Sequence, residues 1–185
     1  MQNSNLSEII IPSSVTKIDE SAFEACTSIR KILIPSSVNS IGPSAFKGCK
    51  SLIEIIFEKS SNLVSIGDHC FEKCHRLFTI SIPSSLKSIG NYAFSGCHSL
   101  REMFFEYPSS INSIGNNALF ECESLKRLLI PPSIFSIGDL AFGNCSSLHC
   151  VIFETPSSLR EIANDPFRGC DSLKQISVPN DLYKK

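Results

Sequence analysis

The sequence predicts an α/β solenoid, a fold in which short and similar coils of chain stack side by side around one continuous core. Two observations support this prediction. Around seven cysteines the same pattern returns, I-P-x-S-[VL]-x-x-I-G-x-x-A-F-x-x-C-x-S-L. These cysteines follow one another in alternating steps of 23 and 25 residues, at Cys26, Cys49, Cys74, Cys97, Cys122, Cys145 and Cys170. Self-similarity with a period of about 20–50 residues is typical of repeat proteins whose units share a core with their neighbours.

The first element of each repeat is a short strand. In the unit 29–51, Ile32 and Ile34 alternate with outward positions, as expected for a strand with one buried face. Pro35 then ends the strand, because proline has no N–H group to donate. A single repeat buries too little apolar surface to offset the entropy of ordering its chain, so the strands must stack in one parallel sheet. We expect eight of them, centred on Ile9, Ile32, Ile55, Ile80, Met103, Leu128, Val151 and Ile176.

The second element follows the glycine of the pattern, where Gly42 is expected to give the backbone freedom at a bend. Most residues after this glycine suit a helix N-terminus. They are Glu20, Pro43, Asp68, Asn91, Asn116, Asp139 and Asn164. A short helical or 3-10 turn is therefore predicted from there to the cysteine, outside the sheet. Two extra residues after Phe57, Phe105 and Phe153 account for the longer repeats. Residues 1–185 then form a single solenoid of about seven full repeats of 23 or 25 residues plus a terminal strand.

Composition and charge exclude several classes of function. The formal net charge is −1, with 19% charged residues of both signs, which argues against nucleic-acid binding. No apolar run approaches the roughly 18–20 residues of a membrane span, so this segment is not expected to insert into a membrane. Residues 1–5 carry neither a basic nor an apolar stretch, so no signal peptide is visible. A cytoplasmic location is compatible with this, as is a targeting segment outside the sequence.

No chemistry-bearing motif stands out from the repeat. The seven equivalent cysteines are predicted to be buried free thiols that fill the core, since cysteine behaves as a small hydrophobe. His75 and His98 each follow such a cysteine and are expected to stack on adjacent repeats, but the C-x-x-C spacing of a zinc site is absent. Serine-hydrolase, zinc-protease and nucleotide-binding motifs are absent as well. We therefore predict no catalytic residue, no metal, no cofactor and no enzymatic activity.

The outward positions of the strands are the candidate binding surface. Their central row is apolar at six of eight places where solvent contact is expected, at Ile10, Leu33, Ile56, Phe104, Leu129 and Ile152. Exposed apolar surface of this extent usually marks an interaction site, and we predict binding through Leu33, Ile56, Phe104, Leu129 and Ile152. A flanking row adds polar groups at Lys31, Glu54, Glu102 and Arg127. Two alternatives to binding stay open: these residue types simply suit strands, or a flanking segment covers this apolar row. A line of basic residues at Arg30, Arg101, Lys126, His149 and Lys174 is either a solvated face or a site for a polyanion.

The full pattern, L-x-x-I-x-I-P-x-S-V-x-x-I-G-x-x-A-F-x-x-C, resembles the BspA-like, or Treponema pallidum-type, leucine-rich repeat, and it covers essentially the whole chain. This resemblance implies a leucine-rich-repeat solenoid with a parallel β-sheet on the concave face and the short helical or 3-10 turns on the convex side, and no catalytic residues. Family members are typically surface antigens and adhesins that bind host proteins or other cells. The predicted function is therefore a protein-binding module of the adhesin type, at the cell surface or secreted, with an unidentified protein ligand. The alternative is an intracellular scaffold of the same fold. Self-association, end to end or through the concave face, is compatible with either function.

Overall fold

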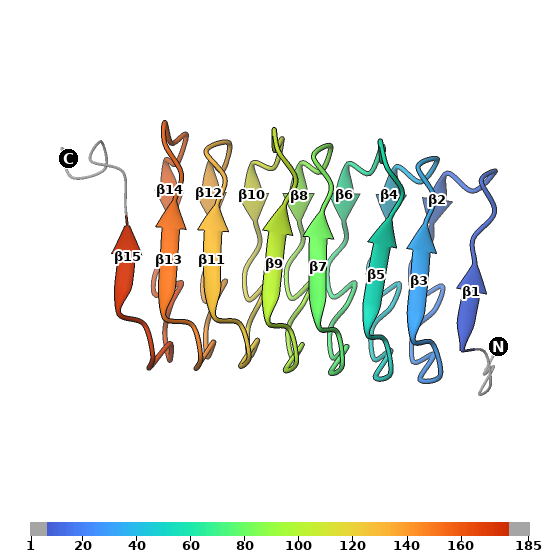
Figure 1. The fold of residues 1–185 in the computed structure, drawn as a ribbon, viewed down its shortest axis with the longest axis horizontal. Helices are drawn as coiled ribbons and strands as arrows, with labels where there is room; N and C mark the ends of the chain where they lie inside the picture. Colours follow the sequence, from blue (N-terminus) through green and yellow to red (C-terminus); the bar gives the residue numbers. More distant parts are fainter. Residues whose placement is uncertain (1–6, 178–185) are drawn as a thin grey trace.

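The structure is a computed structural model that describes residues 7–177. Similar coils stack along one long, nearly straight axis (Figure 1). Each coil contributes a longer strand on one side of the solenoid and a two-residue strand on the other. The longer strands are β1 (Glu8–Ile10), β3 (Lys31–Ile34), β5 (Glu54–Phe57), β7 (Thr79–Ile82), β9 (Glu102–Phe105), β11 (Arg127–Ile130), β13 (Cys150–Phe153) and β15 (Gln175–Ser177). The shorter strands are β2 (Lys17–Ile18), β4 (Ser40–Ile41), β6 (Ser65–Ile66), β8 (Ser88–Ile89), β10 (Ser113–Ile114), β12 (Ser136–Ile137) and β14 (Glu161–Ile162).

All eight predicted strand centres lie in the longer strands, and every strand pair is parallel. Ile32 pairs with Ile9 on one side and Ile55 on the other, so equivalent residues lie in rows across the coils. The shorter strands form a second, seven-stranded sheet that the sequence analysis did not anticipate. Most of its strands are formed by the serine–isoleucine pair that precedes the glycine of the repeat. The isoleucine of this pair is buried in most coils.

The prediction of one continuous sheet of longer strands is wrong. These strands form a five-stranded sheet from β1 to β9 and a three-stranded sheet from β11 to β15, with no pairing between β9 and β11. The ladder is also reduced between β5 and β7, where it consists of Glu54 opposite Thr79. Both interruptions follow a strand from a longer repeat. The two-residue insertion is not a sufficient cause, because β13 has the same insertion and pairs with β15 along three residues.

The helical or 3-10 turns predicted for the convex side are absent from residues 7–177. Two left-handed residues, four positions apart, interrupt each of these segments: Ser44 has φ 54° and Gly48 has φ 70°. A right-handed helix cannot continue through such residues. Instead, alternate N–H groups bond to the next coil, with Ser44 N donating to Asp68 O at 2.8 Å and Phe46 N donating to Cys70 O at 2.8 Å. The segments between the glycine and the cysteine of each repeat therefore form a third hydrogen-bonded ladder between neighbouring coils, on the back of the solenoid.

The residues after the glycine bond between coils and do not cap a helix. Asn91 N donates to Asp68 Oδ1 at 2.7 Å, and Asn116 N donates to Asn91 Oδ1 at 2.8 Å. The expected role of Gly42 at a bend is also wrong, because the left-handed glycines of the described chain are Gly48, Gly96 and Gly169. A Cβ added at Gly42 would lie 2.7 Å from the backbone nitrogen of Glu20. Glycine is thus required by the close approach of neighbouring coils.

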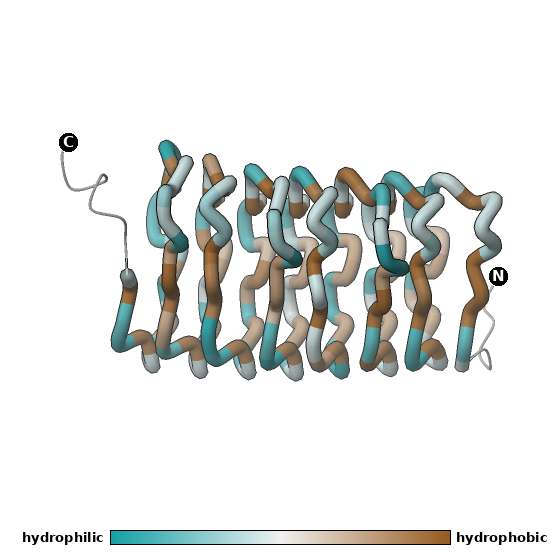
Figure 2. Tube along the Cα trace, turned by 45° about the horizontal axis from the view of Figure 1, so that its top comes forward, coloured by the Kyte–Doolittle hydropathy of each residue, from teal (hydrophilic) through white to brown (hydrophobic). Residues whose placement is uncertain are grey.

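The core consists of rows of identical residues. Phe23, Phe46, Phe71 and Phe94 stack with ring centroids 5.1–5.3 Å apart, and Leu119 interrupts the row. All ladder cysteines except Cys26 donate their thiols to a carbonyl one coil back, as Cys97 Sγ does to Phe71 O at 3.3 Å. Six of the seven ladder cysteines are buried as predicted, whereas Cys26 is half-buried. In Figure 2 the apolar segments of the longer strands recur from coil to coil.

Candidate functional site

The outer surface of the longer strands, called the front face here, is the candidate site. Strand alternation positions its side chains: in β3, Ile32 and Ile34 are buried while Leu33 is 44% exposed. Phe104 on β9 is 51% exposed and Leu129 on β11 is 40% exposed, and two further members of the row are half-buried. We call this row the apolar stripe, formed by Leu33, Ile56, Phe104, Leu129 and Ile152. In-register pairing sets Leu33 beside Ile56 and Leu129 beside Ile152.

The stripe is interrupted at β7, where Ser81 occupies the central position between Ile56 and Phe104. A hollow of about 210 Å³ lies at this place. It is lined by Glu54, Ile55, Ile56, Phe57, Thr79, Ile80, Ser81, Phe104 and Glu106. The sequence analysis missed this feature. One indication of a hollow was present in the sequence, because Ser81 is a small residue in a row of mostly large ones. The reduced pairing of β5 with β7 is seen only in the structure.

Charged residues flank the stripe at the start of the strands. Lys31 Nζ lies 3.0 Å from Glu54 Oε2, across the paired strands β3 and β5. Glu102 and Arg127 occupy the equivalent places on β9 and β11, two strands that belong to different sheets, and no ion pair joins these two residues. Lys31 and Glu54 are about half exposed to solvent, so their ion pair contributes at most about 1 kcal/mol to stability.

A second charged row lies just beyond the carboxyl ends of the strands, at the top of Figure 1. Glu58 Oε2 accepts a hydrogen bond of 2.8 Å from Ser36 N, and this bond lowers the pKa of Glu58. Glu106 Oε2 accepts one of 3.3 Å from Ser84 N in the same way. Pro132 occupies the equivalent place opposite Glu154 and has no N–H, so the Glu154 carboxylate makes no such bond.

Basic residues line the opposite edge, before the strands begin. Arg101 lies over the ring of Phe78, with its guanidinium carbon 4.8 Å from the ring centroid. The residues of this basic line are all exposed; they are Arg30, Arg101, Lys126, His149 and Lys174. The front face is thus apolar along its middle, basic along one edge and acidic along the other.

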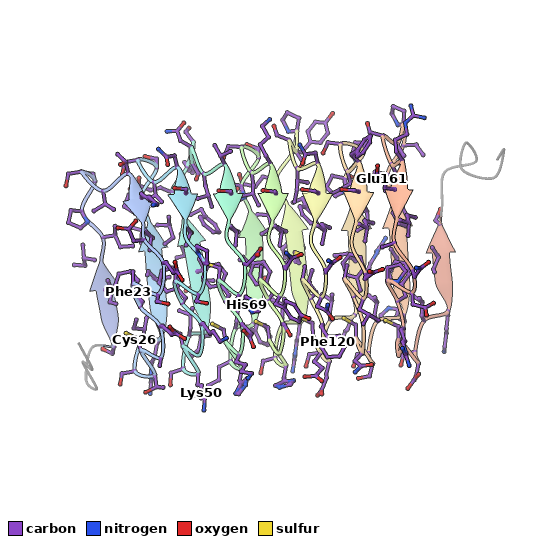
Figure 3. The ribbon with its side chains drawn as sticks, turned by 180° about the vertical axis from the view of Figure 1, so that it is seen from behind. Phe23, Cys26, Lys50, His69, Phe120 and Glu161 are labelled. Carbon is purple, nitrogen blue, oxygen red and sulfur yellow. The ribbon has the colours of Figure 1, made fainter. Side chains whose placement is uncertain are left out.

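The back of the solenoid, shown in Figure 3, carries isolated polar contacts. His69 stacks on Tyr92 with ring centroids 4.9 Å apart, and its Nδ1 lies 2.8 Å from Glu72 Oε2. His75 and His98 lie next to each other on adjacent repeats, with ring centroids 5.1 Å apart and ring planes tilted by 38°, so the expected stacking is not parallel. Burial and the neighbouring imidazole lower the pKa of His75. Between residues 7 and 177, no three His, Cys, Asp or Glu side chains are grouped so that they could hold a metal ion.

Most of the ladder thiols are poorly suited to nucleophilic chemistry, although a hydrogen bond with Cys145 lowers the pKa of Cys170. Burial raises the pKa of Cys49 and of Cys97 to about 12, so both are protonated at neutral pH. Cys150 is the thiol nearest the front face, and it is buried, with its Sγ 3.8 Å from Gln175 Oε1. Within the described part of the chain, no helix is long and apolar enough to cross a membrane.

Comparison with known proteins identifies the repeat. The family described as BspA type Leucine rich repeat region (6 copies) matches residues 1–107 and 64–184. No curated protein matches the chain. Among solved structures, the T. pallidum leucine-rich repeat protein superposes with a TM-score of 0.72 at 26% identity, over 96% of this chain and 80% of its own.

Two further structures share the fold at lower identity. The pneumococcal vaccine antigen PcpA gives a TM-score of 0.67 at 21% identity, over 97% of this chain. This chain spans 62% of the PcpA chain in that structure. A leucine-rich cell surface protein from Faecalibacterium prausnitzii gives a TM-score of 0.58 at 20% identity, over 94% of this chain and 70% of its own.

Proposed function

The chain belongs to the BspA-type leucine-rich repeat family, and from that premise we propose that it is a non-catalytic module that binds a protein through its front face. The observation that carries the proposal is the apolar stripe. Leu33, Phe104 and Leu129 are 40–51% exposed, although the inward residues that precede them, Ile32, Met103 and Leu128, are 0–4% exposed. Exposed apolar side chains gathered in one row usually mark a contact with another protein.

The charged rows belong to the same surface. Strands about 4.8 Å apart and about 13 Å long give the eight longer strands a flat area of roughly 440 Å². A stable interface buries about 800 Å² on each partner. The partner must therefore extend over the acidic and basic edges as well, and the result is an apolar centre with a polar rim.

The partner we favour is a protein outside the cell. Similar solenoids include a vaccine antigen and a cell surface protein. An adhesin-like surface antigen is thus the proposed role. The second candidate is an intracellular scaffold with the same binding face, and the nine free thiols favour it, because disulfides are rare in reducing compartments.

The test uses the pair of substitutions Phe104→Asp and Leu129→Asp in one protein. The immobilised chain is used to capture partners from host-cell surface extracts and from cytosol, and binding of each captured protein is then titrated. We expect the double variant to lose several kcal/mol of binding free energy, as central interface residues do. Its stability should change little, because exposed positions tolerate substitution to within about half a kcal/mol each.

Two controls separate binding from folding. Phe135→Asp replaces a phenylalanine that is 44% exposed but precedes β12, away from the front face, and it should bind normally. Phe94→Asp places a charge in the core and should unfold its neighbours. If the double variant melts like the unchanged protein and still binds, the front face is not the binding surface. If it unfolds, the stripe contributes to the core.

A further inference from the structure

The hollow in the front face has a specific shape. Thr79 and Ser81 are the outward residues of β7, and both are smaller than Ile56 and Phe104 on the neighbouring strands. The hollow of about 210 Å³ therefore has an apolar wall on each side. Its two walls belong to strands separated by β7, so their backbones lie roughly 10 Å apart, which leaves room for a single side chain between them.

The two ends of the hollow are acidic. Glu54, whose carboxylate is paired with Lys31, lines the end nearest the start of the strands, and Glu106 lines the other end. No lysine or arginine lines it. Glu106 is oriented by its 3.3 Å bond from Ser84 N, a residue of the coil that contains β7. This fixed carboxylate favours a cationic occupant, since complementary charge sets both orientation and specificity at interfaces.

An arginine side chain fits these features better than a lysine or an apolar side chain. Its methylene stem suits Ile56, and its planar guanidinium can stack on Phe104 while donating hydrogen bonds to Glu106. The same face already contains this arrangement, because Arg101 stacks on Phe78 at 4.8 Å. The Ser81 hydroxyl is exposed at the floor and can accept one further N–H.

We propose that this hollow is the specificity pocket of the front face and accepts an arginine side chain of the protein partner. The inference rests on the proposed function, because it assumes that a partner covers the stripe. It adds the chemistry that selects the partner: a basic residue, presented between apolar contacts, enters between Ile56 and Phe104.

The experiment uses the full chain, labelled with ¹⁵N, and three blocked peptides that differ in their central residue: arginine, its neutral isostere citrulline, or leucine. We expect the arginine peptide to shift the amide signals of Thr79, Ser81 and Phe104, and to bind at least about fivefold more tightly than the other two. Glu106→Gln should weaken the arginine peptide about fivefold and leave the citrulline peptide unchanged.

Two further variants complete the test. Ser81→Leu fills the hollow with a residue that Leu33 and Leu129 show to be accepted at this position, and it should abolish the preference for arginine. Glu154→Gln removes the equivalent carboxylate of a distant coil and should have no effect. Equal or tighter binding of the leucine peptide would overturn the inference, as would an absence of shifts at Ser81 or equal effects of the two glutamate variants. The proposed function would survive that result if a captured partner lost affinity with Phe104→Asp and Leu129→Asp but bound Ser81→Leu and Glu106→Gln normally.

Discussion

Replacing Gly115 with alanine tests how closely neighbouring coils must approach each other. An added Cβ would lie 2.7 Å from Asn91 N and 2.8 Å from the carbonyl carbon of Gly90, both in the preceding coil. These contacts are with backbone atoms, so no side-chain rotation relieves them. Overpacking costs about 1–3 kcal/mol. Loss of the bond from Asn116 N to Asn91 Oδ1 adds about 1 kcal/mol. We therefore expect Gly115→Ala to lower the free energy of unfolding by about 2–4 kcal/mol.

The matched control is Gly96→Ala. Gly96 has φ +71°, but the nearest atom to an added Cβ is a side-chain carbon of Lys73 at 3.5 Å. Lys73 and Glu121 occupy the equivalent place with φ 59° and 60°, so a side chain is accepted there. The left-handed conformation alone should cost about 1 kcal/mol. Chemical denaturation followed by circular dichroism gives both values, and the melting temperature should fall about 3 °C for each kcal/mol. Equal losses in the two variants would refute the close-approach argument.

The last described coil already carries this substitution. Ala163 replaces the glycine, and the Asn164 N–H makes no bond to Asp139 Oδ1, unlike the equivalent bonds of the preceding coils. Ile162 beside it is 45% exposed, whereas Ile137 in the preceding coil is 2% exposed. β14 keeps its in-register pairing with β12 and is the edge strand of the seven-stranded sheet, so the exposure of Ile162 goes with its edge position.

Two further outcomes follow from the bonds between coils. The thiols of Cys49 and Cys97 have pKa values raised from 9.0 to about 12, so they stabilise the fold below about pH 9 and lose that contribution as pH rises toward 12. Between about pH 8 and about pH 10, the loss from each thiol should lower the free energy of unfolding by about 1 kcal/mol, seen as a lower urea midpoint. An unchanged midpoint would show that these thiols are accessible in the fold. Asn116→Ala removes the acceptor of the Asp139 N–H and should cost about 1 kcal/mol, whereas Asn164→Ala should cost much less, and equal costs in urea denaturation would contradict the ladder.

The repeat period and the strand alternation were sufficient to predict the longer strands, their parallel order and the buried cysteine row. These three features depend on rules that act along the chain or between equivalent residues of neighbouring repeats. The back of the coils could not be predicted in this way. Asp, Asn and Gly suit both a helix terminus and a left-handed turn, and the choice depends on whether Ser44 N and Phe46 N find acceptors in the next coil. Those acceptors belong to residues more than 20 positions away.

The candidate site was predictable in part for the same reason. Outward positions such as Leu33 and Phe104 follow from alternation, and their exposure is seen in the structure. The hollow depends on the reduced pairing of β5 with β7 and on the orientation of Glu106 toward Ser84, and neither is encoded in the repeat pattern.

A second hollow could be built one long period along the solenoid. β11 lies between β9 and β13 as β7 lies between β5 and β9, since each follows a strand from a longer repeat. Leu129 then corresponds to Ser81, and Glu102 and Glu154 correspond to the two acidic ends. One difference opposes a cation: Arg127 replaces Thr79 at the base of the site.

We expect Leu129→Ser with Arg127→Thr to create a second arginine pocket between Phe104 and Ile152. Glu154 is not tied to a backbone N–H, because Pro132 replaces the donor, so the new site should be less rigid and bind somewhat more weakly. Titration with the arginine peptide should shift the amides of both β7 and β11 and fit two sites, whereas Leu129→Ser alone, which keeps Arg127, should fit one. If the double variant keeps its fold and gains no second site, the apolar walls and acidic ends are not sufficient to select arginine, and the selectivity of the first hollow must depend on the Glu106 carboxylate that Ser84 N holds in place.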